Sequence, residues 1–301
     1  MTWFYLALLA PFLYALVNLL DDNLLQFVYK SPYVATVSAG FYGALPLLTR
    51  FFLDSKTLPT NLAIISFGAG LMSLMYFFLY FKALGSDVPS VVVALFGLAP
   101  ATLPFFAHFI VHEHLNSLQM VGFLIVLIAS LGLAVTDFKK LKFSKALVFM
   151  LIAVLLIDAT SLMTKYVYQR VDFYSAYLYF SAGLGTGGLF IFFWKYQENK
   201  KAIKLISKSI KKLLPIFILT ELLALSAEFT LNLAISRGPV SLVKVIEGIQ
   251  PMFVLLIALA LYPVKPKFFR EAEKGGAKRK FLLMSVIIIG LIIIAMNSTV
   301  S

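Results

Sequence analysis

The chain contains no cysteine and few charged residues for its length. The absence of cysteine among its 301 residues excludes disulfide bonds, thiolate metal sites and thiol redox chemistry. Charged residues make up 13% of the chain, whereas soluble proteins carry roughly 25%. Because 61% of the residues are also hydrophobic, the composition excludes an ordinary water-soluble domain.

Long apolar segments fill the sequence instead. Ten of them follow one another, each about twenty residues long and able to cross a hydrocarbon core of roughly 30 Å. We therefore predict an all-α polytopic membrane protein with ten transmembrane helices. The N-terminus has no basic region and no cleavage motif, so we expect no cleaved signal peptide. The predicted spans are 2–20, 32–53, 60–81, 88–111, 117–136, 145–166, 173–194, 213–235, 239–262 and 280–297.

The net charge of +12 is concentrated in three connections between spans, at residues 139–145, 195–212 and 265–280. By the positive-inside rule these connections are cytoplasmic and both termini face outward. Such a distribution is explained by membrane topology, and we expect no nucleic-acid partner. Residues 200–214 place isoleucines at helical spacing among lysines, the pattern of an interfacial amphipathic helix. This segment serves either as a topology anchor, which is the simpler explanation, or as a surface for lipids or partners.

One stretch of sequence occurs twice, 151 residues apart. Residues 83–100 read ALGSDVPSVVVALFGLAP, and residues 234–251 read AISRGPVSLVKVIEGIQP. A shorter repeat, Ser-Ala-Gly, occurs at 38–40 and 181–183. Because five spans per unit is an odd number, the second unit inserts upside down relative to the first. We predict two inverted five-helix repeats around a central cavity: residues 1–140, and residues 141–301 with the basic amphipathic connection 195–214.

The second copy carries Lys244, Glu247 and Gln250 where the first copy is apolar. Each copy ends in a proline, Pro100 or Pro251, which removes a helical hydrogen bond. Carbonyl groups freed at membrane depth are tolerated where they face protein or a water-filled cavity. We interpret this helix as cavity lining, and the alternative is an ion pair that only fixes packing.

Charged residues predicted to lie at membrane depth are the strongest candidates for a binding site. Each costs several kcal/mol, roughly 2.5–3.5 for Asp or Lys at a helix centre, so chains seldom retain them without a use. The carboxylates outnumber the single lysine. In a cavity of low dielectric they can take up protons, as coupling to a proton gradient requires, or they can recognise a cationic or zwitterionic substrate. The predicted substrate-binding residues are Glu228, Lys244, Glu247, Asp158, Glu221, Asn18 and Ser241, with Lys165 as a further candidate.

A histidine cluster offers a different class of function. His108 and His112 have the spacing of a zinc-chelating pair, with Glu113 and His114 beside them. No further histidine or cysteine is present to complete a site. We expect no metal, no cofactor and no enzymatic activity. An intramembrane enzyme using this cluster and a non-transporting scaffold are the alternatives to a transporter.

The chain resembles the drug/metabolite transporter superfamily, EamA type. The similarity lies in the ten-span pattern, the runs into the two prolines, and the run Glu113-x-Leu115-x-x-x-Gln119-x-x-Gly122 between spans four and five. The resemblance implies a cavity lined by spans one to four and six to nine, with spans five and ten as scaffold. The second repeat departs from this pattern, because Val264 occupies the position that matches Glu113.

We therefore predict a secondary active transporter of small polar metabolites such as amino acids or organic cations, coupled to protons and located in the cell membrane. The alternative is a transporter or flippase of a phosphate-bearing or lipid-linked substrate. Expected partners are the small-molecule substrate and membrane lipids, with the protein a monomer or homodimer. Glu228, Lys244 and Glu247 form the predicted recognition and coupling core.

Overall fold

The computed structural model describes residues 2–24, 31–84, 99–134, 145–261 and 277–297, and within these ranges all regular structure is helical. Six helical segments of the described residues are long and apolar enough to cross a membrane, which confirms the predicted all-α polytopic class. The helices are α1 (Thr2–Leu24), α2 (Pro32–Gly43), the 3-10 helix η2 (Leu45–Phe51), α3 (Thr60–Leu84), α5 (Ala99–Ile110), α6 (Ser117–Ala134), α7 (Lys145–Tyr168), α8 (Phe173–Trp194), α9 (Tyr196–Arg237), α10 (Val240–Glu247), α11 (Gln250–Leu261) and α12 (Ala277–Asn297).

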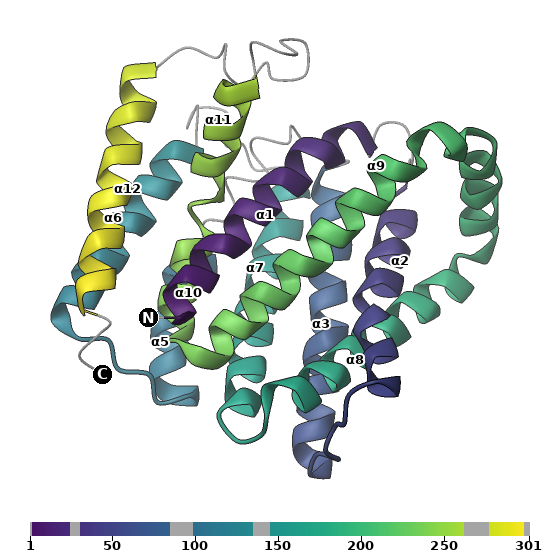
Figure 1. The fold of residues 1–301 in the computed structure, drawn as a ribbon, viewed down its shortest axis with the longest axis horizontal. Coiled ribbons are helices and arrows are strands. Elements are labelled where there is room, and N and C mark those ends of the chain that lie inside the picture. The colour runs from purple at the N-terminus through teal and green to yellow at the C-terminus, as the bar shows by residue number, and fades with distance from the viewer. Residues whose placement is uncertain (1, 25–30, 85–98, 135–144, 262–276, 298–301) are drawn as a thin grey trace.

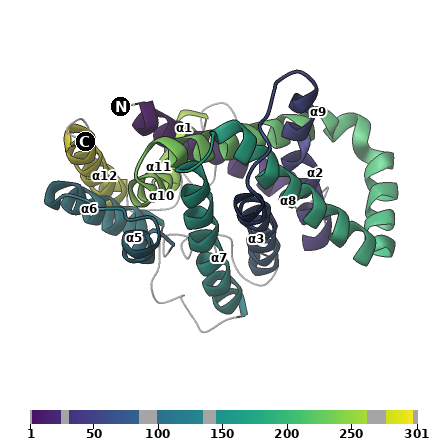
Figure 2. The same ribbon diagram turned by 90° about the horizontal axis from the view of Figure 1, so that it is seen from below.

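The helices form a bundle with two flanks and a central part (Figures 1 and 2). Helix α6 packs against α12 on one flank, and α2 packs against α8 on the other. Between the flanks, α1 packs along α9 and α3 packs along α7. Segments far apart in the sequence therefore lie side by side throughout the bundle.

The two ends of the bundle differ in what they carry. Helix α1 begins and helix α12 ends at one of them, which we call the terminal end (Figure 1). Helices α6 and α11 end, and α12 begins, at the opposite end (Figure 1). Because two of the three lysine-rich connections follow α6 and α11 in the sequence, we call this the basic end.

The predicted span 32–53 is not one continuous helix, so this prediction was wrong in detail. Helix α2 ends at Gly43, and the following residues form η2. Pro46 explains the interruption, since it has no amide hydrogen and its ring would crowd the carbonyl of Tyr42 in a continued α-helix.

The predicted span 239–262 is divided into α10 and α11. The first ends at Glu247 and the second begins at Gln250, immediately before Pro251. At the break, the Ile249 amide bonds the carbonyl of Ile246 at 3.0 Å, three residues back instead of four. The expected effect of the proline is thus confirmed for the second copy of the repeat. Most of the first copy, residues 85–98, lies outside the described residues.

Helix α9 joins the basic connection to the eighth span. It runs for 42 residues without interruption and contains Pro215. Its first part turns away from the rest of the helix (Figure 1). The helix predicted at 200–214 is therefore present, while its interfacial role stays a prediction.

Glycines set the close approach of α8 to its neighbours. A Cβ atom placed on Gly70 of α3 would collide with the carbonyl oxygen of Phe180, and one on Gly183 would collide with that of Phe67. On the other side of α8, a Cβ on Gly40 would lie 2.6 Å from the Cα of Gly188. Small residues at crossings let helix backbones pack closely in membranes. Both glycines of the repeated Ser-Ala-Gly sequence therefore serve helix packing.

We predict that Gly70→Ala destabilises the protein by about 1–3 kcal/mol, because the added methyl group meets rigid backbone. Gly68→Ala is the matched control on the same helix, since its Cβ would meet only the flexible end of Met163 at 3.4 Å. Thermal unfolding in detergent measures both variants. Equal melting temperatures for the two variants would contradict the proposed crossing.

Candidate functional site

A cavity of about 230 Å³ lies among α1, α2, α3, α9 and the break between α10 and α11. The structure brings together at its wall most of the residues predicted from the sequence to bind substrate. Those that line it are Asn18, Glu221, Glu228, Lys244 and Glu247.

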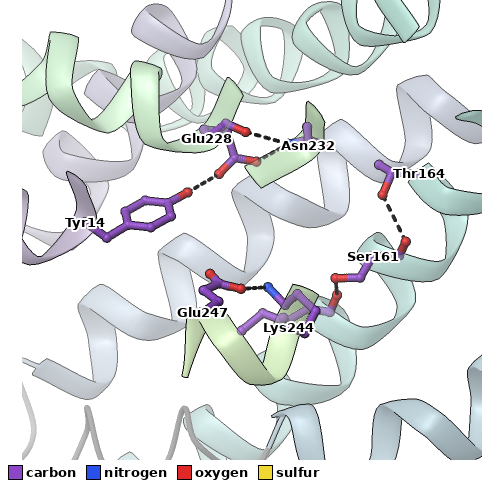
Figure 3. A network of polar contacts seen from close by, with 8 residues as sticks. Tyr14, Ser161, Thr164, Glu228, Asn232, Lys244 and Glu247 are labelled. Atoms are coloured by element: carbon purple, nitrogen blue, oxygen red, sulfur yellow. Dashed lines mark hydrogen bonds and ion pairs between the residues drawn. The ribbon is translucent and has the colours of Figure 1, made fainter. Parts of the chain in front are cut away.

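Glu228 is held by a network of neutral hydrogen-bond donors (Figure 3). The Tyr14 hydroxyl donates to its Oε2 at 2.6 Å, and the Asn232 amide donates to its Oε1 at 2.9 Å. Tyr168 in turn donates to the side-chain oxygen of Asn232 at 2.9 Å. These contacts fix the carboxylate in place but supply no positive charge.

Lys244 and Glu247 form an ion pair on the last turn of α10 (Figure 3). The lysine side chain is 8% exposed and that of the glutamate 21%. Both charges therefore reach the cavity wall from the end of a helix that stops beside it. Since the pair is largely shielded from water, removal of one partner would leave the other charge buried and uncompensated.

Glu221 forms a second acidic position in the cavity. It lies seven residues before Glu228 on α9, which corresponds to about 10.5 Å along the helix axis. The side chain is buried, and it accepts a hydrogen bond from Ser38 of α2 at 2.6 Å. The cavity therefore presents carboxylates at two levels along α9.

Asp158 lies behind the cavity wall rather than in it. Its neighbour Ile157 lines the cavity, while Asp158 itself is 3% exposed. Thr102 of α5 donates to its Oδ2 at 2.5 Å, and its Oδ1 has no hydrogen-bond partner within the described part of the chain. Asp158 is thus an additional acid on a helix that reaches the cavity, but its own side chain is not part of the lining.

Ser241 and Lys165 lie away from the cavity, at the turn between α9 and α10. Ser241 is fully buried and is not among the lining residues. The Lys165 ammonium donates to the carbonyls of Ile235 and Gly238 at 2.9 and 2.7 Å. The sequence predicted Ser241 and Lys165 as residues of the binding site, but neither is among the residues that line the cavity, because both lie at this turn.

Glu113 meets the other side of the same turn. Its carboxylate accepts hydrogen bonds from the amides of Val240 at 2.5 Å and Ser241 at 3.1 Å. Burial raises the pKa of the Glu113 carboxyl, while these hydrogen bonds and the nearby Lys165 ammonium oppose the shift. The sequence singled out Glu113 through its motif and its place beside the histidines, and gave no sign that it would meet this turn.

Aromatic side chains complete the cavity, and the sequence analysis did not single them out. Four of the six lie on α3 as two pairs four residues apart, Tyr76/Tyr80 and Phe77/Phe81, and this spacing places both members of a pair on one face of the helix. Tyr14 lies four residues before Asn18 on α1 and therefore on the same helix face. Because Asn18 was already a candidate cavity residue, its position could have predicted that Tyr14 lines the cavity as well. The aromatic lining residues are Tyr14, Tyr42, Tyr76, Phe77, Tyr80 and Phe81.

The histidines gather at the end of α5. The rings of His108 and His114 pack edge to face with centroids 4.7 Å apart. Within the described residues, no group of three potential ligands is placed to hold a metal ion.

Comparisons with known proteins identify the architecture. Residues 1–135 match the model of the family described as the EamA-like transporter family. Among solved structures, one titled "Crystal structure of protein" aligns with a TM-score of 0.69 and 15% sequence identity, over 100% of this chain and 99% of that chain. At that identity the likeness shows a shared fold alone. The comparison with curated proteins gave no match.

These findings confirm the predicted resemblance to the drug/metabolite transporter superfamily. The EamA-like family consists of membrane transporters rather than enzymes, and the chain has the apolar helices of an integral, multi-pass membrane protein.

We predict that Lys244→Met lowers the free energy of unfolding by about 1–3 kcal/mol, because the partly buried Glu247 is left without its ion-pair partner. The double variant Lys244→Met/Glu247→Gln should regain most of this loss, since neither charge then remains. Thermal unfolding of the single and double variants forms a double-mutant cycle. Additive effects of the two substitutions would show that the ion pair is not coupled in the folded protein.

Proposed function

We propose, from the match of residues 1–135 to the EamA-like transporter family, that the chain is a proton-coupled secondary transporter of small amines, amino acids or organic cations. The observation that carries this proposal is the cavity at the α10–α11 break, whose wall holds more carboxylates than ammonium groups. Glu228, Lys244 and Glu247 form its recognition and coupling core, supported by Asp158 and Glu221.

The charge of the cavity favours a cationic or zwitterionic substrate. Its lining includes three glutamates and one lysine, a formal charge of −2 when all are ionised. Glu247 already forms an ion pair with Lys244, whereas the Glu228 carboxylate accepts its hydrogen bonds from the neutral groups of Tyr14 and Asn232. A substrate ammonium group would supply the missing positive charge, and a substrate carboxylate could displace Glu247 from Lys244.

The aromatic lining supports the same class of ligand. Cations are attracted to the faces of aromatic rings, and this attraction is about 2 kcal/mol or more where the cation is desolvated. The tyrosines and phenylalanines of α1, α2 and α3 surround the space into which Glu228 points. An alkyl or quaternary ammonium group would contact both the rings and the carboxylate.

Proton coupling follows from competition for one carboxylate. A glutamate in a cavity of low dielectric binds either a proton or an organic cation, because both neutralise the same charge. Glu228 is suited to this exchange, since Tyr14 and Asn232 hold it by neutral hydrogen bonds in either case. Alternate occupation of Glu228 would then exchange substrate for protons.

The packing of the helices supports the proposed inverted repeats. In two such repeats α1 corresponds to α7, and α3 corresponds to α9. Exchanging the repeats converts the contact between α1 and α9 into a contact between α7 and α3, and the structure contains both contacts. The contacts of α2 with α8 and of α6 with α12 join corresponding helices to each other. The family match also ends at residue 135, close to the proposed boundary at residue 140.

We predict that a screen of amino acids, polyamines, quaternary amines, sugar phosphates, nucleotide sugars and polyprenyl phosphates finds stabilisation by the amine-containing ligands. A ligand present at about 100 times its dissociation constant adds roughly 2.7 kcal/mol to the stability of the purified protein. Glu228→Gln should abolish this shift, since the carboxylate that binds the ammonium group is lost.

The matched control is Asp54→Asn, which removes a carboxylate outside the cavity. This variant should leave the ligand-induced stabilisation intact. Stabilisation by phosphate-bearing ligands that survives in Glu228→Gln would overturn the proposal in favour of the phosphate-linked or lipid-linked alternative.

In proteoliposomes, we predict that an imposed pH gradient drives accumulation of the stabilising amine and that this amine in turn drives proton movement. The double variant Lys244→Met/Glu247→Gln should fold but transport at a small fraction of the wild-type rate, because the cavity loses its recognition pair. Accumulation that ignores the pH gradient would contradict proton coupling. Undiminished transport by the double variant would contradict the assigned site.

A further inference from the structure

The turn between α9 and α10 connects the two helices that carry the charged residues of the cavity. Helix α9 bears Glu221 and Glu228 and ends at Arg237, and α10 begins at Val240 and bears Lys244 and Glu247. Gly238 and Pro239 alone separate the helices. A movement of this turn therefore changes the position of one set of charges relative to the other.

The turn leaves backbone groups that neither helix can satisfy. The last carbonyls of a helix and the first amides of the next have no partners within their own helices. Lys165 supplies donors to the carbonyls of Ile235 and Gly238, and Glu113 supplies acceptors to the amides of Val240 and Ser241. The signs match the helix ends, because a cation suits the C-terminus and an anion suits the N-terminus.

Both partners reach the turn from other parts of the bundle. Glu113 comes from the connection between α5 and α6, and Lys165 comes from the last turn of α7. A hydrogen bond of 3.3 Å from Gln169, just beyond α7, to the carbonyl of Val111 joins these two elements as well. Four helices are thereby tied together through one turn.

The first helix closes over the same place. A Cβ atom on Gly238 would lie 2.5 Å from the ring of Trp3, so only glycine fits beneath this side chain. Trp3 is itself 7% exposed and belongs to the main hydrophobic core, together with Ala7 of α1, Leu62 of α3 and Ala107 of α5. The terminal end of the bundle is therefore filled with packed side chains around the turn.

The cavity occupies the opposite half of the same helices. Helix α3 gives Leu62, near its beginning, to the packed core, and Tyr80 and Phe81, near its end, to the cavity. Helix α1 likewise gives Trp3 to the core and Asn18 to the cavity. The structure is thus closed at the terminal end, and its ligand space lies toward the basic end.

We propose that Glu113 and Lys165 form a latch that holds the terminal end closed and that must release the α9–α10 turn before the cavity can open to that side. They are positioning residues, because they touch backbone groups of the turn and not the cavity. The proposal rests on the proposed function only in that a transporter must expose one cavity to both sides of the membrane. Val264 replaces Glu113 at the matching position of the second repeat, so the latch belongs to one end of the protein.

The natural absence of cysteine allows a direct test in the full-length protein in proteoliposomes. Ala7→Cys places a reporter thiol in the closed terminal end, where Ala7 is fully buried. Ala39→Cys places another in the cavity wall. A membrane-impermeant maleimide, applied to each side in turn, measures how fast each thiol is reached.

We predict that Glu113→Gln increases labelling of the Ala7→Cys thiol by about tenfold or more, because the two charge-assisted bonds to the turn are weakened. Labelling of the Ala39→Cys thiol from the opposite side should fall or stay unchanged. Lys165→Met should act in the same direction as Glu113→Gln. The matched controls Asp54→Asn and Lys56→Met change exposed residues near the beginning of α3 and should leave both rates unchanged.

A charge-swapped double variant, Glu113→Lys/Lys165→Glu, distinguishes a latch on the backbone from a simple ion pair. The swap would keep opposite charges at the two positions, but it would place each charge at the wrong helix end, so labelling should stay high. Recovery of slow labelling would overturn the proposal.

Two further results would also overturn it. One is that Glu113→Gln changes the labelling rate of the Ala7→Cys thiol by less than about twofold, compared with the protein that carries Ala7→Cys alone. The other is faster labelling of both thiols from both sides, which indicates general loosening.

If Glu113→Gln does not fold, Glu113→Asp keeps the charge with a shorter reach and should give a smaller increase of the same sign. The labelling does not depend on transport, so the latch and the proposed function can fail separately.

Discussion

A backbone amide or carbonyl group that leaves a helix inside a membrane has no water with which to form a hydrogen bond. This constraint explains why polar side chains gather where the chain interrupts its helices. At the α9–α10 turn, Lys165 and Glu113 satisfy the freed groups on either side. At the second break the chain tightens to a shorter bonding pattern before Pro251. Between these two irregular points lies α10, a short helix that presents Lys244 and Glu247 to the cavity.

The charges of the cavity illustrate a second consequence of low dielectric. Lys244 has an anionic partner, whereas Glu228 has only neutral donors. A buried carboxylate in neutral surroundings is stabilised by a proton or by an external cation. The same physical deficit that makes Glu228 costly to bury is the basis of the coupling role that we propose for it. The aromatic lining adds a surface that attracts cations without adding a competing fixed charge.

Helix packing determines where these groups can act. Glycines on α2, α3 and α8 bring the backbones of one flank close together. Gly122 and Gly290 do the same on the other flank, since a Cβ on either would lie about 3 Å from the opposing carbonyl. The two flanks are thus closely packed, and the cavity lies between α2 on one side and the α10–α11 break on the other.

The sequence by itself determined the membrane class, the basic connections, the break before Pro251 and most of the charged residues that line the cavity. These features follow from local composition and from the covalent limits of proline. Only the tertiary structure decided that Tyr14 bonds Glu228 across 214 positions of sequence, that Asp158 lies behind the wall, and that Ser241 lies at the turn. Helical periodicity gives the face of each residue on its own helix, but the partner of that face depends on how distant helices cross.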